Sequence, residues 1–75
     1  MKYMKTATVE AEQLLPLENK IPSGVFPNGN LWIINTIEGR MNVRDGDWIC
    51  TGIDGEKWAV KDDIFKRTYT PCLTL

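Results

Sequence analysis

Hydrophobic and polar side chains alternate along most of the chain, with the period of two that is typical of β-strands. In the first such segment Val9 and Ala11 share one face, while Glu10 and Glu12 share the other. The segments with this pattern are residues 6–14, 31–37, 40–44, 47–53, 56–61 and, as an edge strand, 68–73. They predict five or six short antiparallel strands.

Turn-forming residue pairs separate the later strands. These pairs are Glu38-Gly39, Asp45-Gly46 and Asp54-Gly55. The last pair is the strongest hairpin signal, because Asp-Gly suits the positive φ angles of a type I′ turn. A two-residue loop there would place Trp48 opposite Lys61 on one face of the hairpin. The other face would carry Ile49 opposite Val60, and we expect it to belong to the core.

The remaining segments predict a loop and a short helix. Residues 16–30 contain three prolines and two glycines, which favour a long loop with at most a short turn near residues 17–20. Asp62 is a suitable N-cap for a helical turn that extends to residue 68. We therefore expect one domain, residues 1–75, of the β-dominated α+β class. Its strands would form a curled sheet or half-barrel with one short C-terminal helical turn.

Composition excludes several classes of function. The chain has 75 residues, no histidine, nine Lys and Arg residues, and ten Asp and Glu residues. Without histidine there is no imidazole acid, base or metal ligand, and a net charge of −1 disfavours binding to bulk duplex DNA. No apolar run approaches the length of a membrane helix, and no secretory signal is evident. Cys50 and Cys72 are expected to be reduced thiols, as in a cytosolic protein.

The acidic residues and glycines match no calcium loop, glycosidase pair or phosphate loop. We therefore predict that the chain is not an enzyme and that it holds neither metal nor cofactor. The tryptophans are the more informative residues. Trp58 is expected in the core, which is also the favoured interpretation for Trp32 and Trp48. The alternative is an exposed ring beside a cation, which would suit a nucleotide base or an acidic protein surface. The candidate binding residues are then Trp32, Arg40, Arg44, Trp48 and Lys61.

The C-terminal half carries the pattern G-D-[WY]-I-x-x-G-x-x-G-E-x-[YW]-x-x-K-x-D-I-F-x-x-T-Y-x-P. It is matched at Gly46, Asp47, Trp48, Ile49, Gly52, Gly55, Glu56, Trp58, Lys61, Asp63, Ile64, Phe65, Thr68, Tyr69 and Pro71. In this the chain resembles a family of small accessory proteins of tailed bacteriophages and prophages, largely without assigned function. Its middle departs from that family, which places a helix where residues 16–30 lie. Some relatives also have Cys and Pro where this chain has Val60 and Asp62.

The resemblance implies a phage protein that acts in the cytoplasm of a bacterial host. From that kind of gene we expect a non-catalytic binding protein. The first hypothesis is a stoichiometric inhibitor of a host immune or regulatory complex, in the manner of an anti-CRISPR protein. The second is a homo-oligomer that sequesters a small anionic nucleotide signal in shared pockets. The third is a minor structural or assembly protein of the virion.

Overall fold

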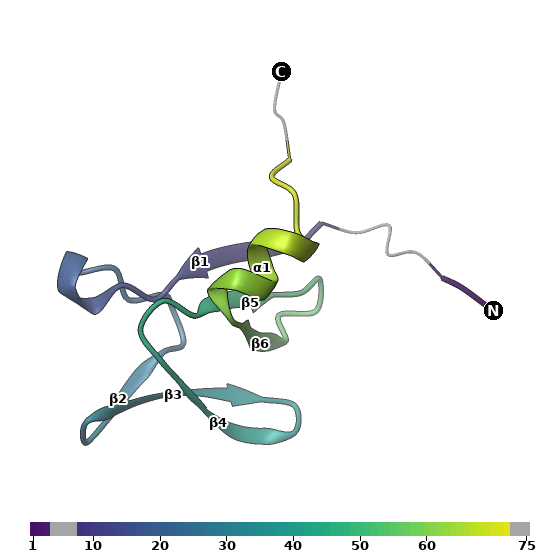
Figure 1. Ribbon diagram of the computed structural model, residues 1–75. Helices are drawn as coiled ribbons and strands as arrows, with labels where there is room; N and C mark the ends of the chain where they lie inside the picture. The colour runs from purple at the N-terminus through teal and green to yellow at the C-terminus, as the bar shows by residue number, and fades with distance from the viewer. Residues whose placement is uncertain (4–7, 73–75) are drawn as a thin grey trace.

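The computed structural model describes residues 1–3 and 8–72. These residues form six short strands and one α-helix (Figure 1). The strands are β1 (Glu10–Gln13), β2 (Phe26–Asn28), β3 (Leu31–Thr36), β4 (Gly39–Val43), β5 (Trp48–Thr51) and β6 (Lys57–Val60). A 3-10 turn, η1 (Pro16–Glu18), follows β1, and the helix α1 (Asp62–Thr68) follows β6. The strands form two antiparallel sheets, with the orders β1-β5-β6 and β2-β3-β4. The predicted fold class is confirmed, with the strands divided between two sheets that do not close into a barrel.

The core lies between the two sheets. In β2-β3-β4, Trp32 is opposite Val43 and Ile34 is opposite Met41, so these residues share the inner face. Ile34 and Val43 are buried there, and Ile49 of β5 meets them from the other sheet. The complete cluster consists of Leu14, Val25, Ile34, Val43 and Ile49, with Trp32 and Ala59 packed against it. A chain of this length has room for one such core.

The predicted hairpin register is wrong by one residue. Trp48 lies opposite Val60, and Ile49 lies opposite Ala59. The loop between β5 and β6 spans residues 52–56, closed by a hydrogen bond of 2.8 Å from the Gly52 amide to the Glu56 carbonyl. Because side chains alternate between faces, a shift of one residue exchanges the faces of one strand relative to the other. Trp58 therefore lies on the same face as Trp48, away from the central core.

Other boundaries also differ from the expected ones. The segment 16–30 is not all loop, because it contains η1 and the edge strand β2, with Pro27 inside the strand. The tight turn before β4 is Ile37-Glu38 rather than Glu38-Gly39, since Thr36 pairs with Gly39. The Asp45-Gly46 turn is confirmed.

At the C-terminal end, residues 69–72 form no strand, and residue 73 lies outside the described residues. The predicted start of the first strand, residues 6 and 7, also lies outside them. Asp62 is the first residue of α1 and not its N-cap. The N-cap is Lys61, which has an extended backbone and whose side chain makes no capping hydrogen bond.

Candidate functional site

The outer face of the β2-β3-β4 sheet is an apolar surface that no further helix or strand of the described residues covers. Phe26 is opposite Ile33, and Leu31 is opposite Asn28, so their side chains point away from the core. Phe26 and Leu31 are each 50% exposed, and Ile33 is half-buried between neighbouring side chains. Exposed apolar patches of this kind, rimmed by polar groups, are typical of protein interaction sites. We call Phe26, Leu31, Ile33, Arg40 and Arg44 the outer face.

Two arginines give the outer face its charge. Arg40 is opposite Asn35 on β3, which places both on the outward side, and Arg44 directly follows β4. Both arginines are exposed, and β2, β3 and β4 contain no acidic residue. The ion pairs found in the described part of the chain are Lys20 with Glu18 and Lys66 with Asp62, so neither arginine has an ionic partner there. The strands of the outer face therefore carry positive charge only, while the exposed Glu38 lies in the turn that precedes β4.

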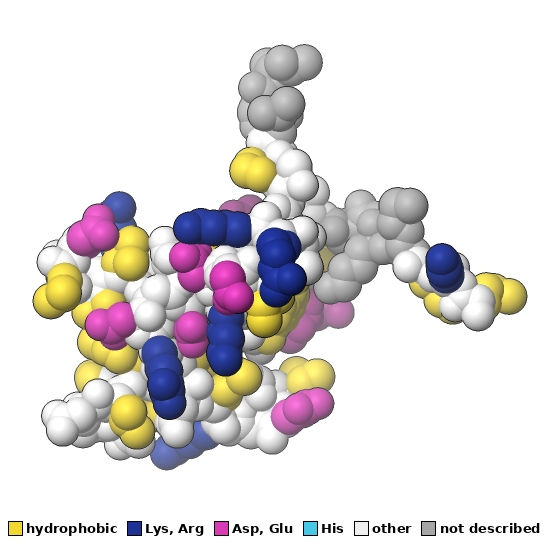
Figure 2. Space-filling view, in the orientation of Figure 1, with side chains coloured by type: hydrophobic (Ala, Val, Ile, Leu, Met, Phe, Trp, Pro, Cys, Tyr) yellow, Lys and Arg dark blue, Asp and Glu magenta, His cyan; other side chains and the backbone are white. Residues whose placement is uncertain are grey.

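The side of the molecule on which α1 lies in front carries mixed charge. In this view Lys and Arg side chains lie interleaved with Asp and Glu (Figure 2). On α1 itself the acidic residues occupy the first turn and the basic residues the last turn, which favours the helix dipole. This surface has no excess of one sign that would favour a charged partner.

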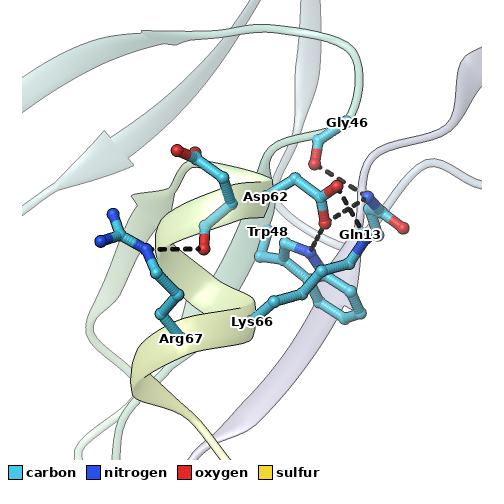
Figure 3. A network of polar contacts seen from close by, with 7 residues as sticks. Gln13, Gly46, Trp48, Asp62, Lys66 and Arg67 are labelled. Carbon is cyan, nitrogen blue, oxygen red and sulfur yellow. Dashed lines mark hydrogen bonds and ion pairs between the residues drawn. The ribbon is translucent and has the colours of Figure 1, made fainter.

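Trp48 lies under α1 rather than on an open surface (Figure 3). Its ring stacks on Phe65 with centroids 4.1 Å apart and an angle of 5°, and Phe65 stacks on Tyr69 at 4.7 Å. The indole N–H donates a hydrogen bond of 2.8 Å to Oδ1 of Asp62. The ring thus attaches the helix to the sheet, and Phe65 covers one of its planes.

Asp62 is the polar centre of this attachment. Its carboxylate accepts hydrogen bonds from Trp48 and from Nε2 of Gln13, at 2.8 and 3.3 Å, and pairs with Nζ of Lys66 at 3.0 Å (Figure 3). The Trp48 hydrogen bond, followed by the Lys66 contact, lowers the pKa of the Asp62 carboxyl below its ordinary value of 3.8, against a smaller desolvation effect. The same Gln13 amide also donates to the Gly46 carbonyl at 2.9 Å, which ties the turn before β5 to β1. We interpret the network as a structural one.

The residues proposed from sequence are thus divided among separate layers. Arg40 lies on the outward side of β4 and the exposed Arg44 directly follows that strand, whereas Trp32 points inward against the core cluster. Lys61 is exposed at the start of α1 and is not opposite Trp48, because the hairpin register differs. The alternative interpretation from the sequence, an aromatic plane flanked by cations, is therefore not formed by Trp48 and Lys61.

Sequence reasoning missed the apolar members of the outer face. The prolines and glycines of residues 16–30 predict a loop at Phe26, although an edge strand tolerates Pro27. Leu31 and Ile33 were recognised as strand residues, but their outward direction follows only from the pairing of β3 with its neighbours. The sequence around β3 offers one signal, the alternation of Leu31 and Ile33 with Trp32 and Ile34. Because both sets are apolar, this alternation does not show which set faces the core.

A groove adjoins the outer face where β3 approaches the loop between β5 and β6. It has a volume of about 900 Å³ and is open to solvent, with Phe26, Asn35, Ile37, Glu56 and Lys57 among its lining residues. An open groove leaves much of a small ligand in water, whereas small-molecule sites usually enclose most of the ligand surface. The groove therefore fits an extension of a protein contact better than it fits a nucleotide.

Comparison with protein-family models, with curated proteins and with solved structures finds no significant match to this chain. Within the described residues, no helix is long and apolar enough to cross a membrane. The same residues contain no group of three or more potential metal ligands. The interpretation of the site therefore depends on the geometry of the chain itself.

Proposed function

We propose that this chain is a non-catalytic binding protein that uses its outer face to bind an acidic, partly apolar surface of another protein. The observation that carries the proposal is the combination of Phe26, Leu31 and Ile33 with two unpaired arginines on one sheet face. Aromatic residues and arginine are the types that most often dominate the energy of protein interfaces. Complementary charge at the rim would add specificity and speed of association.

The resemblance to phage accessory proteins supports a more specific form of the proposal. The partner would be a host immune or regulatory complex, inhibited by occupation of its surface in a stoichiometric, anti-CRISPR-like manner. A small rigid face suits this task because inhibition by occupation needs affinity but no chemistry. The open shape of the groove favours a protein partner over a sequestered nucleotide.

The test uses a double variant, Phe26→Ala with Arg40→Glu, and a matched control, Ile53→Ala with Lys61→Glu. The control makes the same change in charge and also truncates an exposed apolar side chain, but away from the outer face. Each form is expressed in a panel of bacterial strains that each carry one defence system, and plaque formation by a sensitive phage is counted. A tagged form of each is also purified from the strain that responds.

We expect the wild type and the control to restore plaques in one strain and to co-purify with one of its defence proteins at a fixed ratio. The outer-face variant should lose about 2–4 kcal/mol of binding free energy, and with it the inhibition. Equal activity of both double variants would place the binding site elsewhere. Recovery of a nucleotide, and no protein, from the purified chain would favour the sequestration hypothesis.

A further inference from the structure

The outer edge of β4 is a second candidate surface, since it pairs with no other strand of the described residues. It is the longest of the four edge strands, with five residues and no proline, and Gly39, Arg40, Met41 and Asn42 are all exposed. An exposed edge presents backbone N–H and C=O groups that can pair with another strand. The other edges are less suitable, since β2 has three residues including Pro27, β6 is half-buried, and β1 exposes two glutamates.

We propose that β4 pairs antiparallel with β4 of a second copy of this chain, so that Met41 lies opposite Met41 of that copy. The two sheets would join into one continuous sheet of six strands, with both outer faces on the same side. This inference is independent of the proposed function, because it concerns the chain with itself.

Symmetry restricts the registers that such a dimer can have. Residues directly opposite each other in antiparallel strands lie on the same face. A two-fold axis perpendicular to the sheet preserves faces, so one residue of β4 must oppose itself. Near the middle of the strand the choices are Arg40, Met41 and Asn42.

Charge selects among these three registers. If Arg40 opposes itself, two arginines lie directly opposite each other. If Asn42 opposes itself, Arg40 lies opposite Arg44, and this repulsive pair occurs twice. The register in which Met41 opposes itself places Arg40 opposite Asn42. One residue beyond each end of β4, it also places Arg44 opposite Glu38 of the preceding turn, and both pairs occur twice. Opposite charges stabilise cross-strand pairs, whereas like charges directly opposite destabilise them. Only the register centred on Met41 forms attractive pairs without repulsive ones.

The structure leaves the required side chains available. Glu38 and Arg44 are exposed, and neither takes part in an ion pair within the described ranges, 1–3 and 8–72. The Glu38 backbone amide is engaged with Thr36 Oγ1 at 3.1 Å, which holds the turn while the carboxylate stays free. Met41 is 43% exposed on the inward side of the sheet edge, and the second copy would cover it. The Arg44 backbone amide donates to Oδ2 of Asp47 at 3.0 Å, so at this position the guanidinium rather than the backbone would meet the second copy.

The first experiment is a charge exchange read by sedimentation equilibrium over a concentration series up to about 1 mM, where associations with millimolar Kd become measurable. Glu38→Arg alone and Arg44→Glu alone should each raise the dimer Kd by about tenfold or more, because each converts two attractive contacts into repulsive ones. The double variant Glu38→Arg with Arg44→Glu should return to within about threefold of wild type, since the two pairs are re-formed with reversed sign. Arg67→Glu, an exposed arginine on α1, is the control and should leave the Kd unchanged.

The second experiment reads the register directly. Cysteine is introduced at one position of β4 in a Cys72→Ser background, which removes the exposed native thiol and leaves buried Cys50 in place. Under mild oxidation Met41→Cys should form a disulfide-linked dimer, because self-opposed positions bring the two Cβ atoms close to disulfide range. Asn42→Cys should not, since it lies opposite residue 40 of the second copy.

Three results would overturn the proposal. One is a wild-type chain that stays monomeric up to the highest concentration, and another is a charge exchange that fails to restore the dimer. The third is cross-linking at position 42 in preference to position 41, which would show a different register. None of these readouts uses a host partner, so failure here leaves the proposed function standing, and the reverse also holds.

Discussion

Removal of the Phe65 ring tests whether the aromatic stack holds α1 on the sheet. Phe65 is the middle of three stacked rings, so Phe65→Ala removes both contacts, at 4.1 and 4.7 Å. Each aromatic pair contributes about 0.5–1.5 kcal/mol beyond burial, which amounts to about 1–3 kcal/mol for two. Loss of half-buried apolar surface adds about 1 kcal/mol. We therefore expect the free energy of unfolding to fall by about 2–4 kcal/mol, a large part of the roughly 4–11 kcal/mol typical for a chain of this size.

The measurement is urea unfolding followed by tryptophan fluorescence, in which Trp48 reports on the stack. Phe65→Leu is the matched control, because it keeps an apolar side chain and loses only the ring geometry, and its cost should be smaller. Hydrogen exchange adds a local readout, since a helix of seven residues is unstable once undocked. The amides of Phe65 and Tyr69 should then lose protection in the alanine variant. If the free energy of unfolding of the alanine variant lies within about 0.5 kcal/mol of the wild-type value, the reasoning is refuted. A difference that small is typical of a substitution at an ordinary surface position.

Three further predictions concern single residues. Because the folded-state pKa of Asp62 is lowered, its contribution to stability is complete above pH 3.8 and is lost as pH falls through the folded-state value. The stability difference between wild type and Asp62→Asn, followed by urea unfolding at several pH values, should therefore narrow in acid. Gly55 has φ of +82°, so Gly55→Val should cost about 1–3 kcal/mol, and an unchanged thermal midpoint would contradict this. Cys72 is exposed and Cys50 is buried, so a thiol reagent should modify one cysteine quickly and the second only after denaturation.

The helical turn was predicted from Asp62 as its N-cap, although Asp62 is the first residue of α1. Five of the six strands were predictable because each depends on local alternation, whereas β2, which contains Pro27, was not. The register of the β5–β6 hairpin was not, because the decisive packing lies far away in sequence. The observed register turns Ala59 toward the core, where Trp32 packs beside the buried cluster. The expected register would have turned Trp58 to that side instead. Trp48 lies on the same face of β5 in both registers, and there Phe65 stacks upon it.

The candidate site lies on the one sheet face that neither the other sheet nor α1 covers, and only the assembled fold shows which face that is. Two sheets have four faces, and the two inner ones form the core around Ile34 and Ile49. A third face carries α1 and its stacked rings, and within residues 1–3 and 8–72 no further helix or strand covers the fourth. That uncovered face is nevertheless apolar at Phe26 and Leu31, which is costly for an isolated domain unless another surface covers it. The outer face therefore follows from pairing and layer order, and the sequence alone could supply only its arginines.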